Sequence, residues 1–283
     1  MSEVKVNKIS PRSGTTLTIG DSGDTVTIPS GVTLAPGGDL TLTGALTVDG
    51  ASATIKLDGN YPVGTDNVAL GDTALDSVEA GGTENTAIGS KAGTAITTGD
   101  ANTAVGTCAL LANTTGIRNT ALGHRALDAN TDGNCNTAVG MTSLSANIGG
   151  DQNVAVGVEA LSLNTTANNN VAVGYQSLKL NTTGSNLTAV GAFALDENTT
   201  GASNTAIGSS ALNKNTTGDF NIAVGTSSLC TNVTSDNNTA VGYFALKLNT
   251  AANNTAVGYA GLSANIQLLV IVLCKIIQQV QKM

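Results

Sequence analysis

The chain has 283 residues, a formal net charge of −8, and only 2% aromatic residues with no tryptophan. The acidic balance argues against a nucleic-acid partner, which would require a basic surface. The scarcity of aromatic residues excludes a core built on large rings, so small residues must form a thin and regular one. The N-terminus has no apolar leader and the sequence has no apolar run of about 20 residues, so we expect neither a signal peptide nor a membrane span.

Residues 1–60 alternate Thr with Val, Leu or Ile between turns rich in Gly, Pro and Asp. Leu17 and Ile19 are one such pair, and Val26 and Ile28 are another. An alternation of period two predicts short strands. We therefore expect a β-rich N-terminal segment that attaches the chain to a partner or forms a shaft.

Residues 67–265 contain twelve copies of a pentapeptide with the consensus N-[TVI]-A-[VIL]-G. The intervals between the closing glycines are 18 residues, then nine of 17, then 16. A fixed short period is typical of a solenoid, in which one small unit stacks many times. The closing glycines are Gly71, Gly89, Gly106, Gly123, Gly140, Gly157, Gly174, Gly191, Gly208, Gly225, Gly242 and Gly258.

The full repeat reads N-T-A-V-G-x-x-A-L-x-x-N-T-T-G-x-x, and we number its positions from the first Asn. A helical hairpin would need about 30 residues, so the period favours a β-coil. We expect one strand at T-A-V, a corner at Gly, a second short strand near A-L, and a turn at N-T-T-G. The fold class is then all-β, a parallel β-solenoid of about twelve coils. Position 12 is Asn from Asn113 onward, which predicts a ladder of side-chain amides.

Both faces of the T-A-V strand are restricted in every copy. Positions 2 and 4 point to one side and positions 3 and 5 to the other. A strand with one solvated face should vary on that face, so we expect both faces to be covered. The opposite side of the thin coil covers one face. A neighbouring chain is the candidate for the other, and this predicts a homo-oligomer around a common axis, although the sequence does not tell which face is which.

Residues 266–283 change composition abruptly, because Asn, Thr and Gly vanish in the middle of a repeat. Two interpretations stay open: the apolar tail is a capping helix, or it is the product of a reading-frame shift. An allowed set of codons for residues 266–272, read two bases later, encodes Thr-Thr-Ala-Ser-Asn-Ser and so restores the repeat. On that hypothesis a longer array with a C-terminal domain has been lost.

The pentapeptides at residues 102–106 and 204–208 resemble the head repeat of YadA-type trimeric autotransporter adhesins. The resemblance covers the whole repeat array and implies a left-handed parallel β-roll with one repeat per coil, assembled as a homotrimer. The stretch Lys5 to Thr16 is similar to the start of tail-fibre proteins of phages that infect marine bacteria. It implies attachment to other virion or tail proteins through the N-terminus, and assembly in the host cytoplasm, where a signal peptide is not needed.

Aromatic residues recur at one corner of the repeat. Position 6 holds Tyr175, Tyr243 and Tyr259, and position 7 holds Phe193 and Phe244. Stacked coils would place these residues in one column. Two interpretations are open: the column binds a host surface glycan or protein, or it packs against the neighbouring protomer.

Signals for catalysis are weak. The Gly20–Asp24 stretch, G-D-S-G-D, is similar to a serine-protease loop, but His124 is the chain's one histidine and stands at a variable position. Asp76, Asp128 and Asp196 share position 10, where we expect solvated charge and no calcium site. The cysteines show no metal-ligand spacing and are expected to be reduced thiols; they are Cys108, Cys135, Cys230 and Cys274. We expect no enzyme, cofactor or metal.

These observations favour a structural fibre component of a phage virion. The repeat array would be a rigid trimeric spacer that presents a host-binding surface. The alternative is the head fragment of a trimeric adhesin on a bacterial cell surface. A repeat-built enzyme is the third class, and it would need charged groups gathered on one face, which residues such as Lys91, Arg125 and Glu159 do not obviously supply.

Overall fold

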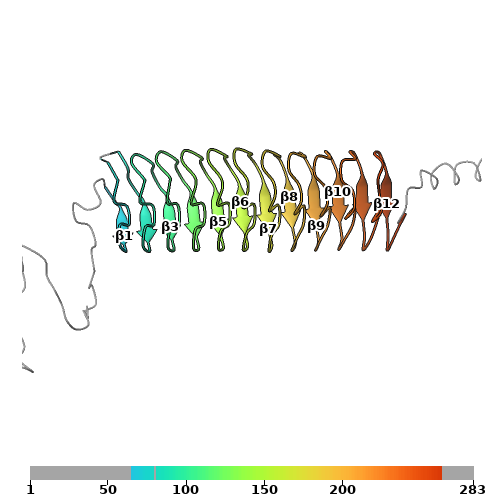
Figure 1. The fold of residues 1–283 in the computed structure, drawn as a ribbon, viewed down its shortest axis with the longest axis horizontal. Coiled ribbons are helices and arrows are strands. Elements are labelled where there is room, and N and C mark those ends of the chain that lie inside the picture. Colours follow the sequence, from blue (N-terminus) through green and yellow to red (C-terminus); the bar gives the residue numbers. More distant parts are fainter. Residues whose placement is uncertain (1–64, 80, 263–283) are drawn as a thin grey trace, which may run out of the picture. The chain divides into compact units, whose positions relative to one another are not determined.

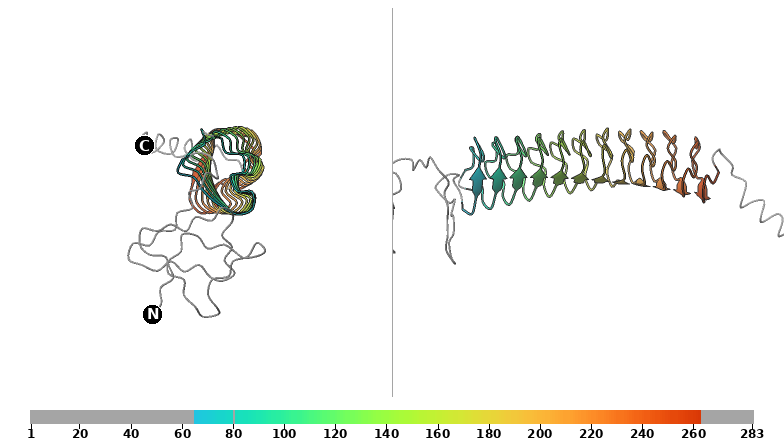
Figure 2. Two further views of the ribbon diagram at one scale, coloured as in Figure 1. Left: turned by 90° about the vertical axis from the view of Figure 1, so that its left-hand side faces the viewer. Right: turned by 90° about the horizontal axis from the view of Figure 1, so that it is seen from below.

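The structure is a computed structural model, and it describes residues 65–79 and 81–262. In this part of the chain each copy of the repeat forms one coil, and the coils stack into a regular array (Figure 1). Viewed along the stack, successive coils follow nearly the same outline (Figure 2). The expected N-terminal segment 1–60 and the tail 266–283 lie outside the described residues.

Twelve strands of three residues each, one per coil, form a single parallel sheet in chain order within the described residues. Equivalent repeat positions pair with one another, so Ala172 of β7 is the partner of Ala189 of β8. The predicted all-β parallel solenoid is thereby confirmed. The strands are β1 (Val68–Leu70), β2 (Thr86–Ile88), β3 (Thr103–Val105), β4 (Thr120–Leu122), β5 (Thr137–Val139), β6 (Val154–Val156), β7 (Val171–Val173), β8 (Thr188–Val190), β9 (Thr205–Ile207), β10 (Ile222–Val224), β11 (Thr239–Val241) and β12 (Thr255–Val257).

Left-handed backbone recurs at position 7, at position 9 and at the residue just before the next coil, which is position 17 in the 17-residue coils. In coil 7, which contains β7, the φ angles are 53° at Gln176, 52° at Leu178 and 60° at Asn186. The second strand predicted near A-L is therefore wrong, because a left-handed Leu cannot continue an extended chain. Those residues lie in turns. They still join the stack, since the Leu178 N–H donates to the carbonyl oxygen of Ala194 at 3.0 Å.

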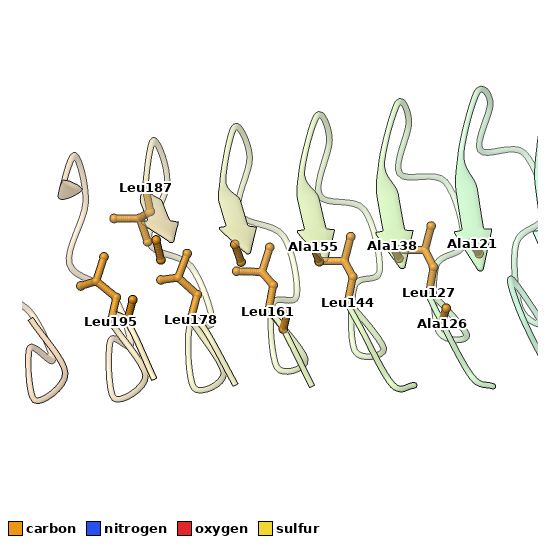
Figure 3. Close-up of a cluster of buried hydrophobic side chains, with 14 of the residues drawn as sticks. Ala121, Ala126, Leu127, Ala138, Leu144, Ala155, Leu161, Leu178, Leu187 and Leu195 are labelled. Carbon is orange, nitrogen blue, oxygen red and sulfur yellow. The ribbon is translucent and has the colours of Figure 1, made fainter. Parts of the chain in front are cut away.

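The core is a narrow column of small and medium side chains inside the coils. Ala at position 3, Ala or Ser at position 8, and Leu at position 9 have almost no exposure, as Ala155, Ala160 and Leu161 illustrate. Figure 3 shows the Leu side chains following one another from coil to coil. Each fully buried Leu contributes about 1.5–3 kcal/mol through removal of apolar surface from water. The core thus grows in proportion to the number of coils.

Two ladders of buried Asn side chains join the coils. The predicted ladder at position 12 is confirmed: Asn181 Nδ2 donates to Asn164 Oδ1 at 3.0 Å, and Asn198 Nδ2 donates to Asn181 Oδ1 at 2.8 Å. A second ladder runs along position 1. There the Asn170 N–H donates to Asn153 Oδ1 at 3.0 Å, and Asn170 Nδ2 donates to the carbonyl oxygen of Gly184 at 2.9 Å.

The position 1 ladder has one interruption within the described coils. Coil 8 begins with Leu187 in place of Asn, and this Leu is fully buried. Its backbone N–H still donates to Asn170 Oδ1 at 2.9 Å. Its side chain has no oxygen to accept the next backbone N–H, that of Asn204, so the ladder restarts there with Asn221 donating to Asn204 Oδ1 at 2.8 Å.

The structure also decides which strand face is inside. Ala172 at position 3 points into the core with no exposure, while Val171 and Val173 at positions 2 and 4 are only half-buried. The same arrangement holds from β2 to β11, because every position 3 residue there is buried and no position 2 or 4 residue is. A single chain therefore covers one face of its sheet and leaves the other partly open.

Candidate functional site

The first candidate surface is the outer strand face, which we define as positions 2 and 4 of β1 to β12. Position 2 is Thr, Val or Ile and position 4 is Val, Ile or Leu in every strand. Exposure nevertheless reaches 45% at Leu122, 36% at Val190 and 42% at Ile207. The face is thus a continuous stripe of β-branched and apolar side chains along the array, of the kind that marks an interaction site.

The second candidate is the aromatic corner at positions 6 and 7, which the structure divides into two groups. Tyr175 and Phe193 form an edge-to-face pair with ring centroids 5.3 Å apart. Tyr243 contacts Phe244 at 4.0 Å and stacks on Tyr259 at 5.3 Å. The two intervening coils carry no ring at these positions; they hold Ser209, Ser210, Thr226 and Ser227. The five sequence-predicted residues therefore do not make one continuous column.

Polar side chains occupy position 7 of coils 6 and 7 and position 10 of coil 7, the coil that carries Tyr175. Glu159 Oε2 accepts a hydrogen bond from Gln176 Nε2 and forms an ion pair with Lys179 Nζ, both at 2.7 Å. These hydrogen bonds from Lys179 and Gln176 lower the pKa of Glu159, and the bond with Glu159 raises the pKa of Lys179. The result is a preformed hydrogen-bonded group on coils 6 and 7, in which Lys179 also interacts electrostatically with Tyr175.

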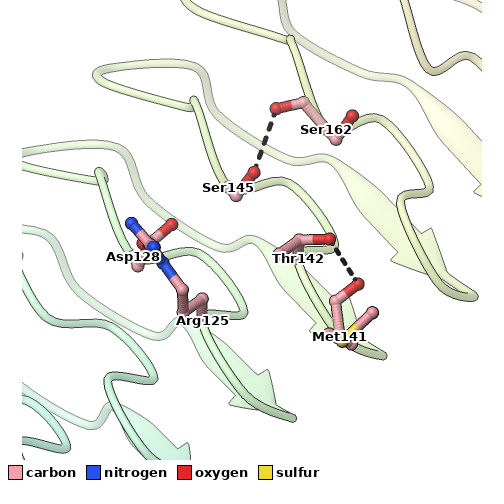
Figure 4. A network of polar contacts seen from close by, with 6 residues as sticks. All are labelled: Arg125, Asp128, Met141, Thr142, Ser145 and Ser162. Atoms are coloured by element: carbon pink, nitrogen blue, oxygen red, sulfur yellow. Dashed lines mark hydrogen bonds and ion pairs between the residues drawn. The ribbon is translucent and has the colours of Figure 1, made fainter.

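Position 10 does not carry simply solvated charge, and the expectation from the sequence is wrong there. Asp128 is 8% exposed, and its Oδ2 accepts a hydrogen bond from Arg125 Nε at 2.8 Å (Figure 4). Oδ1 of Asp196 is buried and has no hydrogen-bond partner among the described residues. Burial raises the pKa of Asp196. The expectation fails because the turn around position 10 leaves Asp128 buried and Asp196 partly buried; Asp76 alone of the three is exposed.

Ser162 shows the same effect at position 10. It is only 6% exposed, and its carbonyl oxygen accepts a hydrogen bond from Ser145 Oγ at 3.3 Å (Figure 4). Position 10 is therefore more covered than its variability in sequence suggests, although several coils carry a charged residue there, Lys179 and Lys247 among them.

The described residues offer little that points to catalysis. His124 is exposed, and the Gly20–Asp24 stretch lies outside the described residues. Within residues 65–79 and 81–262, no group of three or more His, Cys, Asp or Glu side chains could hold a metal ion. Cys108, Cys135 and Cys230 are free thiols in the array. No helix in this part of the chain is long and apolar enough to cross a membrane.

Comparison with protein-family models, with curated proteins and with solved structures finds no match to this chain.

Proposed function

We propose that the repeat array is a rigid structural spacer that assembles as a homotrimer through its outer strand faces. One observation carries the proposal. Twelve strands keep β-branched or apolar side chains at positions 2 and 4, although a single chain leaves these side chains partly exposed. Parallel sheets occur almost only with both faces covered. Three copies around one axis would cover the stripe along its whole length.

Other exposed positions vary widely, and this contrast supports the proposal. Position 7 holds Glu159, Gln176, Phe193 and Ser210 in four successive coils. A position that makes no side-chain contact repeated in every coil tolerates this kind of variation. Positions 2 and 4 do not vary in this way: position 2 is always β-branched and position 4 is always Val, Ile or Leu, so exposure to water alone is a poor explanation for their restricted composition.

The proposed biological role is that of a fibre component of a phage virion, with the N-terminal segment attached to other tail proteins and the array presenting a surface to the host cell. The resemblances to tail-fibre leaders and to trimeric adhesin heads support this role. The head fragment of a bacterial surface adhesin is the second candidate, favoured by the adhesin-like repeats. Mass spectrometry of purified phage particles distinguishes the two, because only a virion component is recovered with the particles.

The oligomeric state is tested with Val173→Asp and Leu163→Asp. A threefold axis would bring three copies of the carboxylate introduced by Val173→Asp into one apolar interface, where unpaired charge is costly. We expect the wild-type chain to sediment as a trimer and the Val173→Asp variant as folded monomers. Leu163 is 44% exposed at position 11, away from the strand, so its variant should remain trimeric. A wild-type chain that sediments as a stable monomer at micromolar concentration would contradict the proposal.

A further inference from the structure

None of the aromatic rings in the described residues belongs to the core. The buried hydrophobic side chains are Ala and Leu with Val78 and Ile96. The described rings instead lie at the surface or are only partly buried, and they are Tyr175, Phe193, Phe220, Tyr243, Phe244 and Tyr259. Since large rings usually bury their area in a fold, rings that the coil does not need for packing point to a contact with another molecule.

Of the two aromatic groups, the Tyr175–Phe193 pair has both hydrogen-bond donors and a carboxylate acceptor on its neighbouring coil positions. We define the coil 6–8 patch by Glu159, Tyr175, Gln176, Lys179, Phe193 and Asp196. Tyr175 is 48% exposed and Phe193 is 36% exposed. Their rings are nearly perpendicular, at 86°. An edge-to-face pair uses one face of one ring for the contact, so further ring face remains for a ligand.

Polar groups of both kinds lie on the coils that carry and precede Tyr175, and Lys179 is close enough to Tyr175 to interact with it electrostatically. Gln176 and Lys179 supply donors, and Glu159 supplies a carboxylate that they hold in place through its Oε2. Among the described residues no hydrogen bond involves Glu159 Oε1, which leaves it as an acceptor for a ligand. Because these side chains already bind one another, little conformational entropy is lost when they engage a partner.

This combination of groups fits a pyranose sugar. The C–H face of a sugar ring is apolar and packs on an aromatic face, while the hydroxyls at its edge both donate and accept hydrogen bonds. The patch spans coils 6 to 8, two steps of about 4.8 Å each. Carboxylates at Glu159 and Asp196, with Glu197 beside Asp196, outnumber the single ammonium of Lys179. An anionic sugar is therefore disfavoured by charge.

The other aromatic group is a weaker candidate. Tyr243 lies between Phe244 and Tyr259, so its ring is engaged within the chain. The ammonium of Lys247 lies 4.1 Å from the centre of the Phe244 ring and occupies that face. Among the described residues, this second group has no counterpart to the carboxylate and amide that are held beside the Tyr175 ring.

We infer that the coil 6–8 patch is a binding site for neutral saccharides, with Tyr175 and Phe193 as the stacking platform and Glu159, Gln176 and Lys179 as the hydrogen-bonding groups. This inference rests on the proposed role of the array in presenting a surface to the host cell. It assigns that role to the six side chains of the coil 6–8 patch. Asp196 borders the site and adds negative charge.

The test uses the full chain and saturation-transfer NMR with three probes: a neutral oligosaccharide set (cellotetraose, maltotetraose and chitotetraose), sialyllactose as an anionic sugar, and an oligolysine peptide. We expect at least one neutral oligosaccharide to bind and sialyllactose not to bind. The variants Phe193→Ser and Tyr175→Ser should each weaken binding about tenfold through loss of ring stacking. Ser already occupies these positions in coil 9, as Ser209 and Ser210, where Ser210 has a φ of 54° against 59° at Phe193.

The matched control is Phe220→Ser, which removes a 60% exposed ring at position 17 and should leave binding unchanged. The inference is overturned if no neutral oligosaccharide binds, if oligolysine or sialyllactose binds more tightly, or if Phe220→Ser weakens binding as much as Phe193→Ser. Sedimentation of the same samples separates the two proposals. Saccharide binding by a monomer would refute the proposed trimer and support the saccharide site. A trimer that binds no neutral sugar would support the proposed trimer and refute the saccharide site.

Discussion

The glycine that closes each pentapeptide is the most sensitive point of the stack, and Gly174→Ala tests this. Gly174 has a φ of +137°, a region that side chains with a Cβ rarely adopt. A Cβ added there would lie 2.6 Å from both the carbonyl carbon and the carbonyl oxygen of Gly191 in the next coil. Ordinary contacts between such atoms are about 3.5–4.0 Å, so coils 7 and 8 would have to move apart.

The expected cost combines two effects. Holding a residue in a sparsely populated backbone region costs about 1–3 kcal/mol. Forcing an extra methyl into a packed contact costs about 1–3 kcal/mol more. Gly174→Ala should therefore lower the free energy of unfolding by about 2–6 kcal/mol, which is a large share of the stability of an ordinary domain. Urea unfolding followed by circular dichroism measures the change.

Two further glycines separate the backbone effect from the collision. Gly225 and Gly258 have the same φ, +128°. A Cβ on Gly225 would lie 2.5 Å from the carbonyl oxygen of Gly242, whereas a Cβ on Gly258 meets no heavy atom within 4 Å among the described residues. Gly225→Ala should thus cost about 1–3 kcal/mol more than Gly258→Ala. Equal costs would show that close stacking contributes nothing, and a wild-type midpoint for Gly174→Ala would refute the reasoning as a whole.

Three further changes test other parts of the array. Asn181→Ala removes a rung that binds both neighbouring rungs and should cost about 2–4 kcal/mol in urea unfolding, because buried partners lose their hydrogen bonds. Burial raises the pKa of Asp196, so the native chain loses stability as the pH rises from the pKa of the unfolded state to that of the folded state. Thermal unfolding measured from about pH 3 to pH 8 should show that Asp196→Asn is more stable than the wild type at neutral pH and lacks this loss of stability with rising pH. Gln152→Asn should stabilise by about 0.5 kcal/mol in the same assay, because Asn tolerates the left-handed φ of 57° found there better than Gln does.

The period of the sequence was enough to predict the coil, the strand and the position 12 ladder. Each of these follows from stacking identical residues at one spacing, so no knowledge of the turns is needed. The left-handed Leu at position 9 could not be predicted in the same way. Leu178 and its equivalents have no intrinsic preference for positive φ, and the buried contact in the core outweighs the local cost. This is why the second strand expected near A-L is a turn.

The second Asn ladder had a visible signal, since position 1 is Asn in every copy except the one that begins with Leu187. The sequence also contains a signal for which face of the strand points inward. Position 3 is Ala in every copy, whereas positions 2 and 4 accept larger branched side chains, as expected if position 3 faces a narrow interior. The division of the aromatic residues into two groups follows from the Ser and Thr residues of coils 9 and 10. Burial at position 10, by contrast, depends on turn geometry that the sequence does not reveal.

The fold separates the residues that hold the stack from those that give it surface chemistry. Positions 1, 3, 9 and 12 supply the two ladders and the core inside the coil, and position 5 supplies the close glycine contact between coils. The backbone of position 7 joins the stack whatever the side chain is, as in the hydrogen bond from the Phe193 N–H to the carbonyl oxygen of Tyr175 at 3.0 Å. Its side chain can therefore change from Thr142 to Glu159 to Phe193 without disturbing the coil. A surface patch such as the coil 6–8 patch can arise on this scaffold by a few substitutions at positions 6, 7 and 10, and its chemistry can change while the array keeps its fold.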